Sequence, residues 1–288
     1  MSIRGCSNLL ERRQISRQHP RVFHHKMNAK QFVHLVLALV CLTTFAGCNT
    51  CHPSASSQPV AGKKCTYVIV HGAWGGGWDW KHVDLLLTAD GHTVYRPTLT
   101  GLGEHSNFTS TNIDLDTHIQ DIVNVILWED LHDVVLVGHS YGGMVITGVA
   151  DRVPGRIKHL VYIDALLPEN GECVNDIIPK GIEIKTSVTN GFVTGDWIKG
   201  NPPPPHDVLM PARTFSKPII LTNQAVAGKL PATYILTVEK GKTPEQDDFY
   251  AFYQRARARG WPAWIMEGNH IVERSHPAEL VKLLEQAP

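Results

Sequence analysis

From residue 65 to the C-terminus, short apolar runs rich in β-branched residues alternate with segments of helical periodicity. The predicted strands lie at 66–70, 93–96, 134–137, 159–163, 233–237 and 263–266. The predicted helices lie at 81–89, 115–128, 143–150, 248–259 and 277–286. Such alternation is typical of an α/β fold with a mostly parallel sheet and helices on both faces. In these sheets, sites gather at the carboxyl ends of the strands.

One turn in this pattern carries a chemical signature. The segment at 138–142 reads Gly-His-Ser-Tyr-Gly and stands between the predicted strand at 134–137 and the predicted helix at 143–150. In that context a Gly-x-Ser-x-Gly sequence places the serine on a sharp, strained turn, where larger flanking side chains would collide with backbone. The following helix directs its positive end toward a developing oxyanion. We therefore interpret Ser140 as a nucleophile.

A serine nucleophile needs a general base, and His270 follows the last predicted strand. It lies on a loop before the terminal helix, at the face expected to carry Ser140. His276 is the alternative, but it opens the terminal helix and is typical of a surface residue. We predict that His270 is the base.

Two backbone amides are candidates for an oxyanion hole. Tyr141 follows the nucleophile, and Ala73 lies in the loop after the first predicted strand. Gly72 and the glycine run at 75–77 allow this loop to approach a substrate closely. We expect Gly72 and Trp74 to contact the substrate.

The acid that orients the base has two candidates. The turn after the penultimate strand contains Glu239 and no aspartate. Asp247 and Asp248 lie further on and are expected to begin a helix, where acidic residues stabilise the first turn. Asp164 directly follows the predicted strand at 159–163, which comes after the helix that follows Ser140. A carboxylate at the end of an apolar strand is costly unless it is paired. We favour Asp164 and keep Glu239 as the alternative.

Residues 166–230 interrupt the alternation of strands and helices. This segment contains four consecutive prolines at 202–205 and the aromatic residues Phe192, Trp197 and Phe215. A stretch of this length between two sheet strands is seldom bare loop. We expect it to form a lid whose apolar residues line a pocket, attach the lid to the core, or do both.

Residues 1–47 are interpreted as an N-terminal extension and export leader. Residues 1–26 are polar and arginine-rich, and Met27 is a candidate translation start. The apolar run at 32–42 is too short to span a bilayer and has the length of a signal-peptide core. It ends in Ala-Gly-Cys, which resembles a bacterial lipoprotein signal with Cys48 as the lipidated residue. We expect a periplasmic protein or a membrane-anchored lipoprotein, with plain secretion as the alternative.

Residues 48–64 are rich in serine and proline and are expected to form a flexible linker before the domain at 65–288. Cys51 and Cys65 could pair in an oxidising compartment, and free thiols are the alternative. The 43% apolar content of the chain suits one sizeable core in that domain.

The charge balance and the distribution of the histidines limit the classes of partner that the sequence supports. The 27 basic and 27 acidic residues give a net charge of zero, so no basic surface for nucleic acid is implied. The 16 histidines are scattered without metal-ligand spacing, so no metal site is predicted. The expected partner is a small-molecule ester, and no sequence signal bears on oligomeric state.

Four motifs give the chain a family likeness: His-Gly-Ala-Trp at 71–74, Gly-Trp-Asp-Trp at 77–80, Gly-His-Ser-Tyr-Gly-Gly at 138–143 and Gly-Asn-His at 268–270. They resemble the α/β-hydrolase superfamily, and within it the branch of plant methylesterases, hydroxynitrile lyases and related bacterial esterases. The likeness runs from about Thr66 to Leu284. It implies a parallel sheet with an inserted lid, a serine–histidine pair completed by an acid, and no cofactor.

Two positions bear on the choice between esterase and lyase. The lyases of this branch place threonine and lysine where this chain has Gly72 and Ile271. Without that lysine nothing obvious would stabilise a leaving cyanide. The chain also lacks the family's aspartate after the penultimate strand, and Asp164 matches the placement used by haloalkane dehalogenases. We therefore expect a serine carboxylesterase, with a hydroxynitrile lyase or a non-catalytic ligand binder as alternatives.

Overall fold

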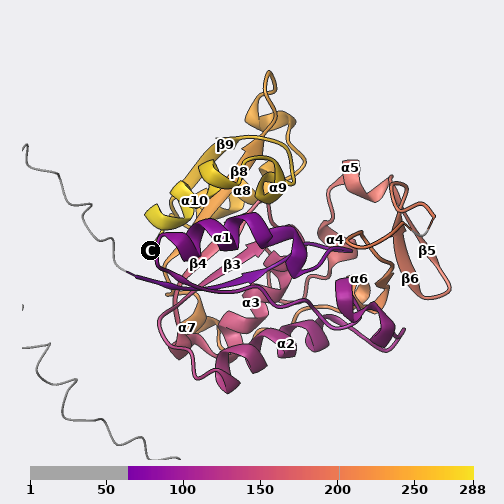
Figure 1. The fold of residues 1–288 in the computed structure, drawn as a ribbon, viewed down its shortest axis with the longest axis horizontal. Coiled ribbons are helices and arrows are strands. Elements are labelled where there is room, and N and C mark those ends of the chain that lie inside the picture. Colours follow the sequence, from indigo (N-terminus) through magenta and orange to yellow (C-terminus); the bar gives the residue numbers. More distant parts are fainter. Residues whose placement is uncertain (1–63, 201) are drawn as a thin grey trace, which may run out of the picture. The chain divides into compact units, whose positions relative to one another are not determined.

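The computed structural model describes residues 64–200 and 202–288 (Figure 1). The predicted leader, Cys48 and Cys51, and all of the predicted linker except Lys64, lie outside these residues. Within the described ranges, no helix combines the length and apolar character that a membrane span requires.

Six parallel strands form the central sheet, in the order β2-β1-β3-β4-β8-β9 (Figure 1). Each of the six predicted strands corresponds to one of them, with bounds shifted by at most two residues at either end. The mostly parallel sheet expected from the sequence is therefore confirmed. The strands are β1 (Thr66–Val70), β2 (Thr93–Tyr95), β3 (Val134–His139), β4 (Ile157–Ile163), β8 (Ala232–Val238) and β9 (Ala263–Glu267).

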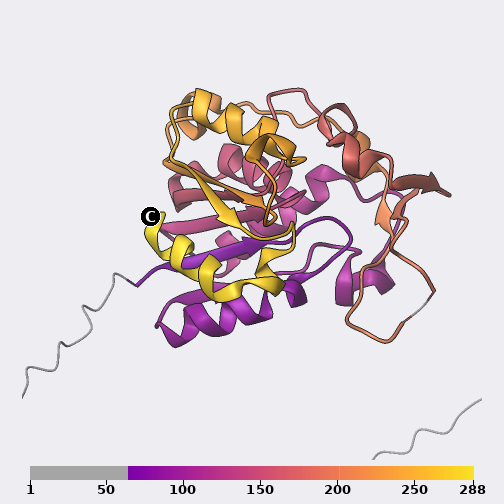
Figure 2. The same ribbon diagram turned by 90° about the horizontal axis from the view of Figure 1, so that it is seen from above.

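Helices cover both faces of this sheet, as Figure 2 shows. Side chains alternate along each strand, so that Val68 and Leu136 belong to one apolar cluster. Tyr67 and Val137 belong to a second cluster on the opposite face. The first cluster is covered by α2 (Leu115–Trp128), α3 (Gly142–Arg152) and α8 (Tyr250–Ala258), and the second by α1 (Lys81–Ala89) and α10 (Pro277–Gln286).

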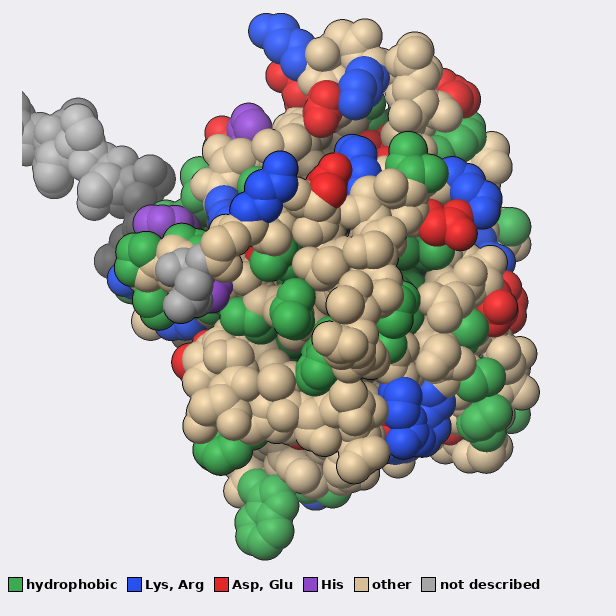
Figure 3. All heavy atoms as spheres, turned by 90° about the vertical axis from the view of Figure 1, so that its right-hand side faces the viewer, with side chains coloured by type: hydrophobic (Ala, Val, Ile, Leu, Met, Phe, Trp, Pro, Cys, Tyr) green, Lys and Arg blue, Asp and Glu red, His purple; other side chains and the backbone are tan. Residues whose placement is uncertain are grey.

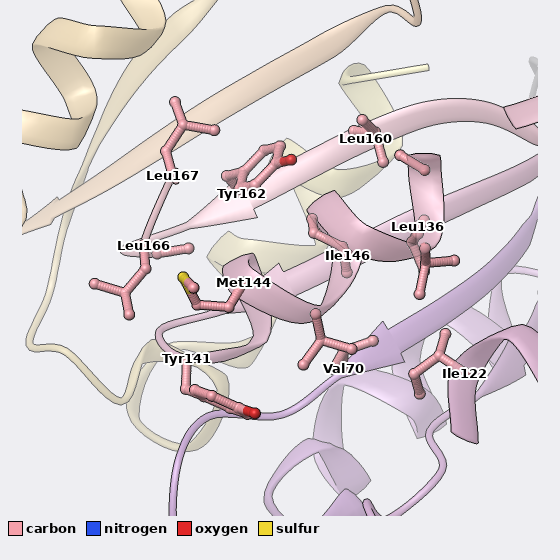
Figure 4. Packing of buried hydrophobic residues seen from close by; sticks show 14 of the residues in the cluster. Val70, Ile122, Leu136, Tyr141, Met144, Ile146, Leu160, Tyr162, Leu166 and Leu167 are labelled. Atoms are coloured by element: carbon pink, nitrogen blue, oxygen red, sulfur yellow. The ribbon is translucent and has the colours of Figure 1, made fainter. Parts of the chain in front are cut away.

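Helix α3 packs directly on the centre of the sheet. Figure 4 shows its residues Met144 and Ile146 among Val70, Leu136 and Leu160, which come from three neighbouring strands. All five side chains are buried. The helix that follows the serine is therefore anchored by the core, and its first turn is held in a fixed place above the strand ends.

The segment predicted as a lid contains an element that the sequence did not reveal. It forms an antiparallel three-stranded sheet, which Figure 1 shows beyond the end of the central sheet, together with four short helices. The strands are short, and most residues of β5 are exposed, so no apolar alternation marked them. The elements are α4 (Val174–Ile177), α5 (Lys180–Glu183), β5 (Thr186–Thr189), β6 (Phe192–Gly195), β7 (Met210–Pro211), α6 (Arg213–Ser216) and α7 (Gln224–Ala227).

Polar contacts fasten this segment to the rest of the domain. Asp151 of α3 accepts hydrogen bonds from the backbone amides of Thr222 and Asn223 at 2.9 and 2.7 Å. Arg255 of α8 forms an ion pair with Glu172 at 2.7 Å. The outer face of the segment, seen in Figure 3, carries acidic, basic and apolar side chains interspersed rather than a field of one sign.

Candidate active site

Ser140 occupies a strained turn between β3 and α3. Its φ of 53° lies in the left-handed region that non-glycine residues seldom adopt. The turn needs Gly138 and Gly142 because of close backbone approach: a Cβ on Gly138 would lie 2.8 Å from the carbonyl oxygen of Gly142. A Cβ on Gly142 would lie 2.5 Å from the carbonyl oxygen of Val70. Strain of this kind is typical of functional turns and is held in place by the packing of α3.

The structure brings Ser140, His270 and Asp164 together in one hydrogen-bonded chain. Ser140 Oγ lies 3.0 Å from His270 Nε2, and His270 Nδ1 lies 2.8 Å from Asp164 Oδ2. The three residues follow β3, β9 and β4, so they meet at the carboxyl end of the sheet. This arrangement has the geometry of a nucleophile, a base and an orienting acid.

Asp164 is buried, and hydrogen bonds hold both of its carboxylate oxygens. Its side chain is 1% exposed, and its second oxygen, Oδ1, accepts a hydrogen bond from the backbone amide of Thr237 at 3.0 Å. The residue has a φ of 44°, which turns its side chain away from the strand axis of β4 at a cost in backbone strain. Both carboxylate oxygens are thus satisfied, as a buried charge requires.

The alternative acid, Glu239, is not brought to the base. Its carboxylate forms an exposed ion pair with Lys242 at 2.8 Å, and it lines the mouth of the cavity. Asp247 lies in the cavity wall, and its Oδ1 accepts a hydrogen bond from the amide of Phe249 at 2.9 Å. Of the two candidates left open by the sequence, the geometry places Asp164 beside His270. His276 immediately precedes α10, and its Nδ1 lies 2.8 Å from Ser275 Oγ.

Opposing effects act on the protonation of His270. Burial lowers its pKa, whereas the hydrogen bond and the charge of Asp164 raise it, and the balance lies above the ordinary histidine value. Nδ1–H of the neutral ring donates a hydrogen bond to Asp164, so Nε2 carries no proton and faces the serine hydroxyl. This is the tautomer that a general base for Ser140 requires.

Ala73 and Tyr141, whose amides were predicted to form an oxyanion hole, line the same cavity as Ser140. Within the described part of the chain, neither donates a hydrogen bond to another residue, so both are free to serve a ligand oxygen. The loop of Ala73 is fixed by His71, whose Nε2 accepts from the amide of Leu99 at 3.1 Å and whose Nδ1 lies 2.7 Å from the Gly72 carbonyl. Burial lowers the pKa of His71 to about 4, so its ring is neutral and one nitrogen donates while the other accepts.

A second buried histidine fixes the residue after the nucleophile. His118 Nε2 lies 3.0 Å from the carbonyl oxygen of Thr100, and its Nδ1 lies 3.0 Å from the Tyr141 hydroxyl. Burial lowers the pKa of His118 to about 4, so Nε2 donates to the carbonyl and Nδ1 accepts from the tyrosine. No spacing in the sequence predicts these roles for His71 and His118, because their contacts with Leu99, Thr100 and Tyr141 join separate parts of the chain.

A cavity of about 410 Å³ opens beside the serine and is lined by all three residues of the hydrogen-bonded chain. One wall is aromatic: the ring of Trp74 lies 5.0 Å from Trp197 and 5.7 Å from Phe215, and Phe215 stacks parallel to Tyr141 at 6.2 Å. Trp197 and Phe215 belong to the segment predicted as a lid. Gly72 and Trp74, predicted to contact substrate, both line the cavity.

A group of charged residues also lines the cavity. Asp79 forms an ion pair with Arg274, whose guanidinium lies 4.3 Å from the ring centre of Trp78. Burial raises the pKa of Asp79 to about 6 against the opposing effect of Arg274. Glu273 is 2% exposed, its Oε2 lacks a hydrogen-bond partner among the described residues, and burial raises its pKa to about 7. No motif or spacing in the sequence predicts this group of charged residues.

Among the residues that the structure describes, no group of three histidine, cysteine or acidic side chains is arranged to hold a metal ion.

Comparison with known proteins agrees with this architecture. A model of the alpha/beta hydrolase family matches residues 67–283. This chain belongs to that family. It is 47% identical over 128 residues to a carbendazim hydrolyzing esterase of Nocardioides sp. strain SG-4G, a match covering 44% of this chain and 53% of the relative. It is 29% identical over 123 residues to an alpha-hydroxynitrile lyase of Arabidopsis thaliana, covering 42% and 48%.

These two matches span about half the length of each curated relative. Among solved structures, an extracellular α/β-hydrolase from a Paenibacillus species superposes with a TM-score of 0.61 at 24% identity, over 78% of this chain and 99% of the other. At that identity the likeness shows the fold alone. The resemblance inferred from the four sequence motifs is confirmed at the level of the family.

Proposed function

We propose that this protein is a serine esterase. The observation that carries the proposal is the continuous series of hydrogen bonds from Ser140 Oγ through His270 to Asp164. These residues line a cavity large enough for a small ligand. The similarity to a relative described as a hydrolyzing esterase supports the same class of reaction.

In the proposed mechanism, His270 Nε2 takes the proton of Ser140 as Oγ attacks the ester carbonyl carbon. The carbonyl oxygen becomes an oxyanion, which accepts hydrogen bonds from the amides of Ala73 and Tyr141. The imidazolium, stabilised by Asp164, gives its proton to the departing alkoxide, and the alcohol leaves. Water, deprotonated by His270, then attacks the acyl-enzyme and releases the acid with the serine restored.

The shape of the cavity favours small or medium esters with an aromatic group. The aromatic rings of Trp74, Trp197 and Phe215 offer one continuous apolar wall beside the serine. A flat ring can stack or pack edge-on against such a wall. Carbendazim and aryl acetates are therefore the first substrates to test.

The lyase alternative is less well supported by the residues around the base. Ile271 follows His270 and is partly exposed, so no lysine stands next to the imidazole to receive a cyanide leaving group. The lysines in the cavity wall are Lys185 and Lys242, and Lys242 is paired with Glu239. Release of benzaldehyde from mandelonitrile at a rate above that of ester hydrolysis would reverse this preference.

The test of the proposed function compares the wild type with Ser140→Ala on p-nitrophenyl acetate. Loss of the nucleophile is expected to lower kcat by roughly 10⁴-fold or more, because the hydroxyl has no substitute in the cavity. Equal rates for the two proteins would contradict the proposal and leave a ligand-binding role.

The sequence of the N-terminal segment supports a second proposal, that the protein is exported and anchored through lipidated Cys48. Metabolic labelling with a palmitate analogue is expected to mark the wild type and to spare Cys48→Ser. An unlabelled wild type would contradict lipidation and leave plain secretion.

A further inference from the structure

Two other rings lie against the imidazole of His270. The ring of Phe249, which precedes α8, lies parallel to it with centres 4.7 Å apart and an interplanar angle of 10°. The ring of His139 also lies with its centre 4.7 Å away, at an angle of 39°. His139 is the last residue of β3 and immediately precedes Ser140. The base is thus held by a residue of the same turn that carries the nucleophile.

His139 also contacts the main chain of His270. Its Nε2 lies 2.7 Å from the carbonyl oxygen of His270. A carbonyl only accepts hydrogen bonds, so Nε2 carries the proton and donates it. Burial lowers the pKa of His139 to about 3, so the ring is neutral and this proton is its only one. Glu273 Oε2 is 4.0 Å from the same nitrogen, which is too far for a hydrogen bond.

The hydrogen bond from His139 reaches a part of the main chain that no regular element holds in place. His270 lies in a turn between β9 and the short helix α9 (Val272–Ser275), outside any regular element. Its ring is directed by Asp164 through Nδ1, but a hydrogen bond to the ring alone leaves the backbone of the turn free to shift. Misplacement of a catalytic group by about 1 Å can cost on the order of a hundredfold in rate.

We propose that His139 is a positioning residue, which fixes the main chain and ring plane of His270 so that one strand end sets the place of both nucleophile and base. The proposal rests on the serine esterase function for its kinetic consequences. Its geometry is independent of substrate, and this allows the two to be tested separately.

The kinetic test uses His139→Phe, which keeps a flat buried ring but removes the donor. We expect kcat to fall roughly 10- to 100-fold, with KM within about threefold, because phenylalanine keeps a flat ring at this position of the cavity lining and the aromatic wall is unchanged. The matched control is His159→Phe. His159 is a buried histidine on β4 whose Nε2 lies 2.9 Å from Thr233 Oγ1, outside the cavity. We expect its kcat to stay within about twofold of the wild type.

A spectroscopic readout separates positioning from general damage. The His270 Nδ1 proton, hydrogen-bonded to Asp164, is expected to give a proton resonance well downfield of the amides. In His139→Phe this resonance should broaden or vanish as the turn moves and solvent exchange accelerates, whereas in His159→Phe it should persist. If His139→Phe retains both the rate and the resonance of the wild type, the proposal is wrong.

A second pair of variants covers the case in which His139→Phe does not fold. The amide nitrogen of His139→Gln can occupy the place of Nε2, whereas that of His139→Asn is too short to reach the carbonyl. We expect His139→Asn to be at least tenfold slower than His139→Gln, and equal rates would overturn the proposal. If the wild type hydrolyses no ester, and the resonance is present in the wild type but lost in His139→Phe, the esterase function is refuted and the positioning role stands.

Discussion

The two sides of the cavity are built from different kinds of structure. On one side, the ends of β3, β4 and β9 supply Ser140, Asp164 and His270, and these strands lie between helices anchored in the core. On the other side, the lid segment supplies Trp197 from the turn after β6 and Phe215 from the short helix α6. The reactive groups therefore stand on the sheet side, whereas two of the three rings of the aromatic wall come from the inserted segment and the third, Trp74, lies in the loop after β1. We infer that changes on the sheet side alter kcat, whereas changes on the lid side alter KM and substrate preference.

The largest expected effect tests the sheet side. Replacement of Asp164 by Asn should lower kcat by roughly 10⁴-fold, because the imidazole loses its orientation and the stabilisation of its charged form. The matched change Glu239→Gln, at the alternative acid in the cavity mouth, should leave kcat within about threefold. The reverse order of the two effects in steady-state kinetics would assign the acid to Glu239.

The pH dependence of kcat/KM in Asp164→Asn tests the direction in which Asp164 shifts the pKa of His270. Asp164 raises the pKa of His270, and the base must be neutral to act. The acidic limb of the kcat/KM profile should therefore move to lower pH in the variant, while its plateau falls. A limb that stays in place would mean that Asp164 does not set the protonation of the base.

The next largest effect concerns the pH dependence of the free energy of unfolding, to which Glu273 in the cavity lining contributes. Burial raises the pKa of Glu273 from 4.5 to about 7, so between these pH values the folded protein holds a proton that the unfolded chain has lost. Stability should fall by about 3 kcal/mol as pH rises through this window, on account of this residue alone. Glu273→Gln does not titrate and should show a smaller fall in urea unfolding between pH 4.5 and 8.

An exposed glutamate provides the control for that experiment. Glu279→Gln on α10 should follow the wild type at every pH, since its side chain lies at the surface. If Glu273→Gln and the wild type lose stability equally with rising pH, the carboxyl of Glu273 is already ionised in the folded protein at low pH.

The smallest effect tests the lid side. Trp197 is 43% exposed and contacts Trp74 edge-on, so Trp197→Ala should remove part of the aromatic wall with little change in fold. For an aryl ester, KM should rise roughly three- to tenfold, about 1 kcal/mol, with kcat nearly unchanged. Ethyl acetate, which lacks a ring to contact the wall, serves as the control substrate. A fall in kcat for both substrates would break the division between the two sides.

The same division explains how much could be predicted from the sequence. The bounds of α1, α2 and α10 were predicted to the residue, because their apolar periodicity is continuous and they pack on a buried sheet. The closeness of Ser140 and His270 followed from their places after two parallel strands, since such strand ends meet at one edge. Local patterns therefore sufficed for the regular elements of the sheet side and for the pairing of Ser140 with His270.

Local patterns did not suffice where contacts join distant segments. The strands β5, β6 and β7 were missed because they are short, and the choice of acid stayed open because it depends on a turn of the backbone at Asp164. The contact of His139 with His270 joins residues 131 apart in the chain and depends on their packing. Such features depend on tertiary structure, and no periodicity or spacing marks them.

The central claim is that His270 activates Ser140 for attack on a carbonyl. It is tested most directly by covalent labelling with a fluorophosphonate, followed by mass spectrometry of the peptide that contains Ser140. We predict stoichiometric modification of Ser140 in the wild type and a labelling rate at least 100-fold lower in His270→Ala. No adduct on Ser140, or equal labelling rates in the two proteins, would contradict the account.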